Sequence, residues 1–271
     1  MSSEELPERL SHYTDLNGLF GIVEHKEFWL SNVSFLNDRE ELSHGLAAAK
    51  AIVVELQKRA PEKDMRREIL NKLVRRMSGR SIPDTYVACF CEKPDLLSQW
   101  RGYGSVQGVS IHFNGAGLKD NFVRSGTELY QVVYGNVQTK KQVEDAIAAS
   151  VPEIQHEIDW LLGNTDKEIE AEFFKLVSRL APKFKHSGFE EECEWRLVLQ
   201  EPDASEIQFR ARGKVLLPYV KLPTVRQLPI EAITVGPGDE DGQVAASVQF
   251  FLAKRGYTEV SVRRSETPYR T

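Results

Sequence analysis

Hydrophobic and polar positions along this chain repeat with two different periods, which predict both helices and strands. Leu16, Leu19, Phe20 and Val23 follow the spacing of a buried helix face, and Asp15 can cap that helix. Short hydrophobic runs, several of which alternate with polar residues, are typical of strands. We expect strands at residues 27–31, 85–91, 108–113, 128–134, 194–200, 207–211, 215–221, 232–235 and 258–262.

Longer helical patterns interrupt this series of strands. We expect helices at residues 39–59 and 62–77, where Pro61 suits the start of the second helix. A central pair at residues 139–162 and 165–185 is separated by a break at Gly163. A last helix is expected at residues 240–255.

The order of these elements predicts the fold class. Strands, a helical stretch and further strands differ from the strict alternation of a doubly wound sheet. We therefore predict an α+β fold with a mixed or antiparallel sheet, flanking helices and a helical insert at about residues 138–186. Because no segment rich in Pro, Gly and Ser divides the chain, we expect a single domain over residues 1–271.

Composition and charge exclude several classes of protein. With 41% hydrophobic residues, the 271-residue chain can bury a substantial core, which excludes a disordered protein. The net charge of -5 argues against a protein that coats nucleic acid, although basic residues cluster at 63–80 and 254–270. The polar N-terminus lacks the apolar run of a signal peptide, and no run reaches the roughly 18 apolar residues of a membrane span. We expect a cytoplasmic protein without membrane association.

The three cysteines are expected to be buried thiols in a reducing compartment. Cys89 and Cys91 lie in one apolar run at the spacing of a strand, and Cys193 lies far from them in sequence. A zinc site needs about four ligands at recognisable spacing, so no metal site is predicted. The chain also lacks the G-x-G-x-x-G, Walker, H-E-x-x-H and G-x-S-x-G motifs.

Candidate chemistry begins with His12, Tyr13 and Thr14, at the end of a short strand before the capped helix. A histidine at such a junction can bind a ribose hydroxyl or act as a base. The alternative is a histidine that satisfies nearby backbone groups. Next along the chain, Asn37 and Asp38 are explained as caps of the helix that follows them.

The polar and aromatic segment 92–107 is expected to be a loop that joins two strands. It carries Trp100, Arg101 and Tyr103. Aromatic faces can stack on the rings of a nucleotide, and arginine pairs bidentately with phosphate. The alternative is a packed loop with Trp100 in the core.

A late acidic segment supplies the candidate carboxylate. On the strand that follows Cys193, Glu194 and Arg196 share one face and Trp195 lies on the other. The pair can be a plain salt bridge, or a catalytic carboxylate held by its neighbour. Glu192 is a rival for the same role.

The order of these motifs resembles a bacterial family of unknown function, DUF2971. The resemblance rests on His-Tyr-Thr, Trp-Leu-Ser, Leu-Asn-Asp, Cys-Phe, Ser-Gln-Trp-x-x-Tyr, Gly-Val-x-Ile-x-Phe and Glu-x-Glu-Trp-Arg, and it spans nearly the whole chain. In this sequence the motifs lie at residues 12–14, 29–31, 36–40, 89–90, 98–103, 108–113 and 192–196.

The layout of an early histidine, a middle aromatic and a late glutamate is in turn similar to that of ADP-ribosyltransferases. This likeness implies a split sheet, NAD as the substrate, and a nucleic-acid or protein acceptor in a toxin or phage-defence system. It implies that His12 binds a ribose, Tyr103 stacks on nicotinamide and Arg101 meets the pyrophosphate. Glu194 would bind the ribose 2′-hydroxyl and stabilise the oxocarbenium ion. The implied set is therefore catalytic Glu194 and His12, with His12, Tyr13, Thr14, Trp100, Arg101 and Tyr103 binding NAD.

Two other functions stay open at this point. A hydrolase or nuclease could use His12 with Asp38 or Glu194 around a divalent metal. A non-catalytic module could instead sense a nucleotide or bind a partner protein.

Overall fold

The computed structural model describes residues 5–35, 84–103, 107–123, 126–134 and 181–268, with single positions between 47 and 71 and at 141. Contacts within the chain group it into two compact units, each considered by itself. The single domain expected for the whole chain stays a prediction. Unit 1 comprises Met1–Asn32, Tyr86–Gln131 and Glu191–Thr271, and unit 2 comprises Val33–Thr85 and Val132–Glu190.

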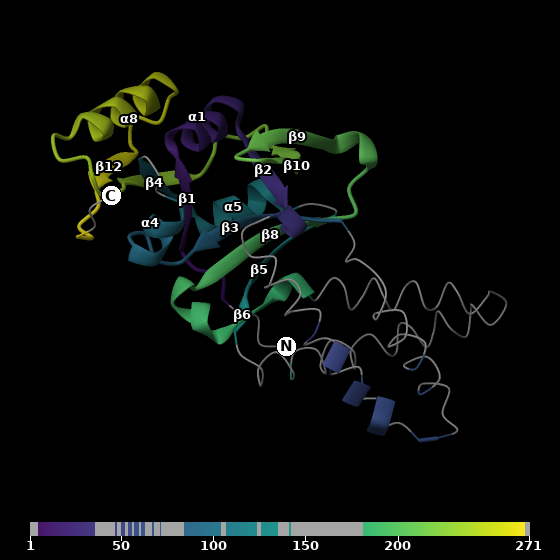
Figure 1. Ribbon diagram of the computed structural model, residues 1–271. Helices are drawn as coiled ribbons and strands as arrows, with labels where there is room; N and C mark the ends of the chain where they lie inside the picture. The colour runs from purple at the N-terminus through teal and green to yellow at the C-terminus, as the bar shows by residue number, and fades with distance from the viewer. Residues whose placement is uncertain are drawn as a thin grey trace. The chain divides into compact units, whose positions relative to one another are not determined.

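A ten-stranded sheet is the framework of unit 1 in the described residues (Figure 1). Its order is β12-β11-β4-β1-β3-β2-β10-β9, with β8 paired to β3 and β5 paired to β8. The β11–β12 ladder is parallel, and the ladders from β1 to β3 and β4, β2 to β3 and β10, β9 to β10, β4 to β11 and β5 to β8 are antiparallel. The α+β prediction with a mainly antiparallel sheet is confirmed. The strands are β1 (Arg9–Asp15), β2 (Glu27–Asn32), β3 (Thr85–Cys91), β4 (Gly108–Asn114), β5 (Thr127–Gln131), β8 (Glu194–Gln200), β9 (Ile207–Arg212), β10 (Val215–Pro223), β11 (Ile230–Val235) and β12 (Ser261–Arg264).

The two faces of this sheet are covered differently. Leu10, Phe28, Ile111, Trp195 and Ile233 point to one side, here called the core face, where they pack with residues of three helices. The other side, here called the opposite face, carries a smaller cluster that includes a residue of α4. The helices of the core face are α1 (Leu16–His25), α5 (Gly115–Phe122) and α8 (Gln243–Lys254), and α4 is Leu97–Tyr103.

Helix α1 begins as predicted but turns a different side to the core. The Asp15 carboxylate accepts a hydrogen bond from the Gly18 N–H at 2.7 Å, as a helix cap does. Leu16 and Phe20 were expected to be buried, but they are 36% and 51% exposed. Phe20 packs instead against Phe251 of α8, with ring centroids 5.7 Å apart. The buried residues of α1 are Leu19, Ile22 and Val23.

The hydrophobic pattern of the sequence did not predict two short helices. Residues 97–103, expected to be loop, form α4, and α5 follows β4 directly. The Asn114 side chain caps α5 by accepting from the Gly117 N–H at 2.9 Å. Helices of seven and eight residues span about two turns, which is too short for a clear hydrophobic period.

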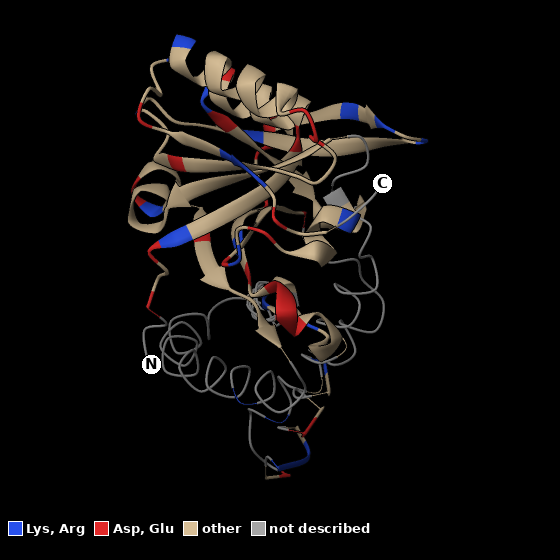
Figure 2. Cartoon of the chain, turned by 90° about the vertical axis from the view of Figure 1, so that its left-hand side faces the viewer, with Lys and Arg blue, Asp and Glu red and all other residues tan. Residues whose placement is uncertain are grey.

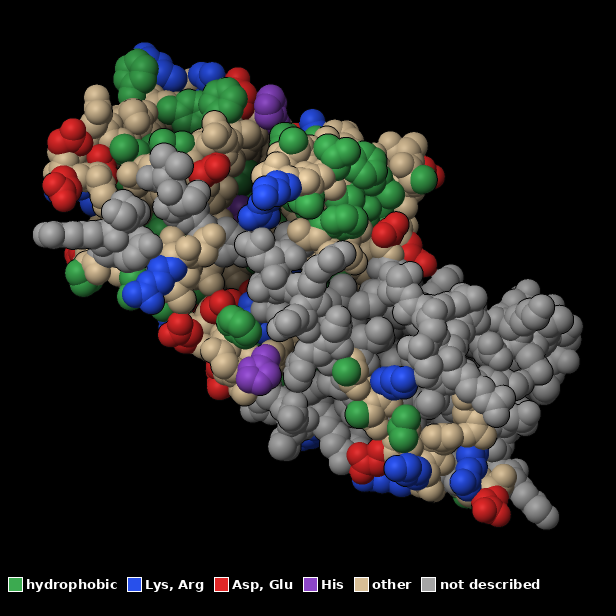
Figure 3. Space-filling view, viewed as in Figure 1, with side chains coloured by type: hydrophobic (Ala, Val, Ile, Leu, Met, Phe, Trp, Pro, Cys, Tyr) green, Lys and Arg blue, Asp and Glu red, His purple; other side chains and the backbone are tan. Residues whose placement is uncertain are grey.

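Strand β9 joins β10 through a two-residue turn at Gly213 and Lys214. Gly213 has a φ of 59°, the left-handed conformation that glycine adopts without steric cost. Figure 3 shows hydrophobic side chains gathered over this hairpin. Phe209, Val215 and Leu216 are its exposed large hydrophobic residues, at 63%, 50% and 66%.

Unit 2 contributes a two-stranded parallel sheet of β6 (Val133–Tyr134) and β7 (Phe184–Lys185). β7 and the 3₁₀ turn at Ala181–Lys183 correct the expected helix, which was to continue to residue 185. The other predicted helices of residues 39–77 and 139–180 lie mostly outside the described residues, as do Asp38 and most of the expected helical insert.

Candidate functional site

His12 connects two neighbouring strands of the sheet. The β1–β3 ladder has one registered pair, Ser11 with Cys91. One residue further along β1, the His12 Nδ1 lies 2.8 Å from the Cys89 carbonyl oxygen of β3. A carbonyl oxygen only accepts, so Nδ1 carries the proton and Nε2 has the lone pair in the neutral ring. The imidazole therefore joins β1 to β3 by a bond to the backbone.

The surroundings of His12 favour the neutral ring. Its ring centroid lies 5.5 Å from that of Phe28 and 5.6 Å from that of Phe90. Burial lowers the pKa of His12, and the hydrogen bond to the Cys89 carbonyl offsets part of this effect. A neutral His12 can accept a proton or a hydroxyl hydrogen bond only at Nε2.

Tyr13 points to the opposite face and supports the start of α4. Its hydroxyl donates to the Lys93 carbonyl at 2.8 Å and accepts from the Leu96 N–H at 2.9 Å. Its ring meets the Trp100 indole edge-on, with centroids 4.8 Å apart, and Trp100 is only 2% exposed. The open stacking surface expected of Trp100 is therefore corrected to a packed side chain.

Asp95 holds the C-terminal segment against α4. Its Oδ1 accepts from the Trp100 Nε1, the Ser265 hydroxyl and the Thr267 hydroxyl at 2.6, 2.6 and 2.9 Å. Its Oδ2 accepts from the Glu266 N–H at 2.9 Å. Burial opposes ionisation, but these hydrogen bonds hold the pKa of Asp95 below its usual value. Asp95 is thus a structural anchor that sequence reasoning did not single out.

The other residues of the expected NAD-binding set are placed as follows. Thr14 pairs with Val109 and shares the core face with His12. Arg101 is exposed in the last turn of α4. Tyr103 is the last residue of α4, and the direction of its side chain lies outside what the structure describes.

Glu194 and Arg196 form a buried ion pair on β8. The Arg196 Nε donates to Oε1 of Glu194 at 2.7 Å, and Nη2 donates to Oε2 at 3.1 Å. The two side chains are 6% and 8% exposed. This bidentate geometry is among the strongest hydrogen-bonded arrangements of charged groups in proteins.

The sheet separates the predicted catalytic residues by face. Trp195 and Leu197 pack in the core cluster, so Glu194 points to the opposite face. His12 pairs with the core residue Ile111 in the β1–β4 ladder and points to the core face. The resemblance implies that His12 and Glu194 act around one NAD molecule, but their side chains point to opposite faces of the sheet. Tyr13, Trp100 and Glu194 lie on the opposite face.

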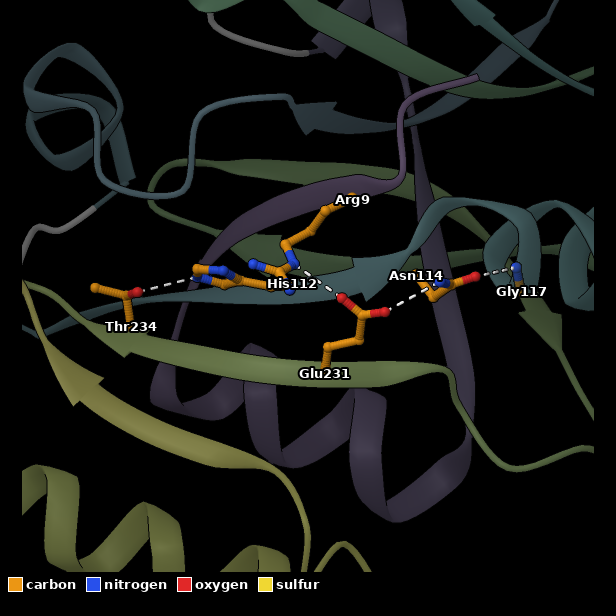
Figure 4. A network of polar contacts seen from close by, with 6 residues as sticks. All are labelled: Arg9, His112, Asn114, Gly117, Glu231 and Thr234. Atoms are coloured by element: carbon orange, nitrogen blue, oxygen red, sulfur yellow. Dashed lines mark hydrogen bonds and ion pairs between the residues drawn. The ribbon is translucent and has the colours of Figure 1, made fainter. Parts of the chain in front are cut away.

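A polar network crosses β1, β4 and β11 on the opposite face (Figure 4). Glu231 accepts from the Arg9 Nε at 2.8 Å and from the Asn114 Nδ2 at 3.0 Å. The His112 Nε2 lies 3.0 Å from the Thr234 hydroxyl oxygen, which accepts a hydrogen bond from the Arg263 Nε. Sequence reasoning missed this network, because its members come from strands far apart in sequence.

His112 is fully buried within that network. Burial, with the positive charges of Arg263 and Arg9 nearby, lowers the pKa of His112 to about 4. Among the described residues, neither its Nδ1 nor the hydroxyl of Ser11, its neighbour across the β1–β4 ladder, has a hydrogen-bond partner. The imidazole is therefore neutral over the physiological pH range.

The described residues contain no group of three or more His, Cys, Asp or Glu that could hold a metal ion. A metal-assisted hydrolase built on His12 and Glu194 has no support in this geometry, because the two side chains face opposite ways. Its other expected ligand, Asp38, lies outside the described residues.

Comparison with known proteins finds one family model that matches part of the chain, and it gives no function. Residues 99–197 match a family model described as "Protein of unknown function (DUF2971)", which supports the resemblance found in the motifs. No curated protein and no solved structure matches the chain. Within the described residues, no helix is both long and apolar enough to cross a bilayer. Figure 2 shows acidic and basic residues intermixed along the chain.

Proposed function

We propose that this chain is an ADP-ribosyltransferase that uses NAD as its substrate, with Glu194 as the acting carboxylate. The observation that supports this most is the bidentate pair with Arg196, 6% and 8% exposed. Buried ion pairs add little net stability compared with apolar residues of similar volume. A charged pair at this position is therefore better explained by a chemical role than by folding alone.

The chemistry follows from the charge of the carboxylate. Arg196 donates to both carboxylate oxygens of Glu194, and a carboxylate offers about four lone-pair sites in all. Such a group can hold an arginine and accept a ribose 2′-hydroxyl at the same time. As the bond from ribose C1′ to nicotinamide breaks, nicotinamide leaves with the electron pair and positive charge develops on the ribose. A fixed carboxylate stabilises that charge, and an acceptor nucleophile then bonds to C1′ and releases its proton.

In this proposal His12 is a positioning residue. It keeps β1 bonded to β3 at the Cys89 carbonyl, and β3 in turn pairs with the strand that carries Glu194. Arg196 fixes the orientation of the carboxylate. The acceptor, in nucleic acid or protein, and a role in toxin or phage-defence systems stay part of the proposal.

The test is nicotinamide release from NAD, measured by chromatography with water, protein extract or oligonucleotides as acceptor. We expect release by the wild-type chain and a loss of at least about 100-fold in Glu194→Gln. Gln keeps the size and one acceptor oxygen for Arg196, so the fold should survive. Glu191→Gln, at an exposed site three residues away, is the matched control and should release nicotinamide normally. Equal release by wild type and Glu194→Gln would refute the role of this carboxylate.

A second candidate is a non-catalytic module that binds a nucleotide or a partner protein. It is favoured by the internal contacts of Tyr13 and Trp100, which hold α4 in place. This candidate predicts that the wild-type chain binds NAD in calorimetry without releasing nicotinamide. It also predicts that Glu194→Gln has the same effect on cell growth as the wild type.

A further inference from the structure

Two aromatic rings form a platform on the opposite face of the sheet. Trp29 of β2 and Tyr219 of β10 stack with centroids 4.7 Å apart and planes inclined by 27°. They point away from the core because their neighbours Phe28 and Val220 lie in the core cluster. The platform thus lies on the same face as Glu194.

The guanidinium of Arg210, on the adjacent strand β9, lies against this platform. Its central carbon is 5.2 Å from the Trp29 ring centroid and 5.4 Å from that of Tyr219. Its Nη2 donates to the Ser31 hydroxyl at 3.0 Å. From here on, the name Arg210 platform means the two rings of Trp29 and Tyr219 together with Ser31 and Arg210.

Lys221 also lies over the Trp29 indole, but unlike Arg210 it has an ion pair with a carboxylate. The Lys221 Nζ lies 5.4 Å from the Trp29 centroid and 3.3 Å from a Glu27 carboxylate oxygen. The same carboxylate oxygen accepts from the Trp29 Nε1 at 2.7 Å. Arg210 has no such ion pair with any carboxylate in the described part of the chain. Its buried Nε also has no hydrogen-bond acceptor there.

The surroundings of Arg210 disfavour its positive charge, mainly because the group is partly buried. Burial and the charge of Arg212 lower the pKa of Arg210, while Tyr219 and Asp15 act in the other direction. A buried N–H without an acceptor is unfavourable, and more so when it belongs to a charged group. An oxyanion bound to the guanidinium would supply the missing negative charge.

We propose that the Arg210 platform binds a phosphate group, and in particular the diphosphate of a nucleotide. The planar guanidinium presents N–H donors that match phosphate oxygens in pairs, and the two rings hold its plane fixed. The assignment of this site to the nucleotide used at Glu194 rests on the proposed function. It transfers the expected pyrophosphate contact from Arg101 to Arg210.

The test is a calorimetric titration of the full-length chain with inorganic pyrophosphate at constant ionic strength. Loss of a charge-assisted, paired contact should weaken binding by about 10- to 100-fold in Arg210→Gln. Arg212→Gln is the matched control. It removes the same charge from an exposed site on the same strand, and should weaken binding less than about threefold.

A measurement on the wild-type chain covers the case in which Arg210→Gln fails to fold. The Trp29 indole N–H resonance, assigned with Trp29→Phe, should shift during the pyrophosphate titration. An unmoved resonance overturns the proposal, as does equal weakening by Arg210→Gln and Arg212→Gln. Absence of binding at about 10 mM pyrophosphate also overturns it.

The phosphate site and the transferase can fail separately. If Glu194→Gln binds pyrophosphate normally while the wild type releases no nicotinamide, the phosphate site stands and the transferase fails. If nicotinamide is released while Arg210→Gln binds pyrophosphate like the wild type, the phosphate site fails and the transferase stands.

Discussion

Replacement of His112 by glutamine should remove a defined part of the acid sensitivity of this fold. The imidazole is fully buried beside Thr234, and its pKa is about 4 against an ordinary value of 6.5. The folded chain keeps the ring neutral, whereas the unfolded chain protonates it as the pH falls below 6.5. Between these two pKa values the unfolded state binds more protons, so acid favours unfolding.

The size of the effect follows from the gap between the two pKa values. Each pKa unit corresponds to about 1.4 kcal/mol, so a gap of about 2.5 gives roughly 3 kcal/mol below pH 4. Between pH 7 and pH 5, the same relation gives a loss of about 2 kcal/mol from His112 alone. The loss begins near pH 6.5 and is complete near pH 4.

The assay is urea unfolding from pH 4.5 to pH 7.5, which compares the free energy of unfolding of wild type and His112→Gln. The variant should be less stable at pH 7, because it repacks a buried site, but its stability should fall less steeply with acid. Exposed His25, at the end of α1, gives the control His25→Gln, which should keep the wild-type pH dependence. Parallel curves for wild type and His112→Gln would refute this account of the buried imidazole.

Three further outcomes can be measured directly. Asp95→Asn, which weakens a carboxylate bonded to four donors, should lower the free energy of unfolding by about 2–3 kcal/mol in urea. Asp203→Asn, at an exposed turn, is the control and should lower it much less. Burial raises the pKa of the Cys91 thiol to about 12. A thiol reagent at pH 8 should therefore label Cys91 very slowly, as measured by mass spectrometry. Rapid labelling of the folded chain would contradict its burial. Gly115→Ala places a Cβ 2.0 Å from a backbone carbonyl oxygen and should destabilise by about 1–3 kcal/mol, whereas Gly21→Ala, with nothing within 4 Å, should not.

Local patterning predicted the main strands well. The expected strand at residues 85–91 has the bounds of β3, and the one at 194–200 has the bounds of β8. Alternation also predicted that Glu194 and Arg196 share a face that Trp195 does not, and their salt bridge is present. These features depend on side-chain direction within one strand, which the order of residues determines.

The relation between strands could not be predicted in the same way. Alternation assigns His12 to one face of β1, but it does not say which face the helices cover or how β1 and β8 are placed around β3. The contacts of Asp95 with Ser265 and Thr267 join positions 170 and 172 residues apart. The pairing of Arg210 with Ser31 spans 179 residues. Such contacts depend on strand order in the sheet, for which no local pattern exists.

The pairing of β11 with β4 shifts by one residue between Ile230 and Ala232, which is a β-bulge. Ile230 and Ile233 both lie in the core, three positions apart rather than the two or four of a regular strand. The extra residue is Glu231, whose carboxylate meets Arg9 and Asn114. Deleting Glu231 would restore a regular alternation and remove this acid in a single step. A chain without Glu231 would therefore show whether β4 and β11 still pair when the register shift between them is removed.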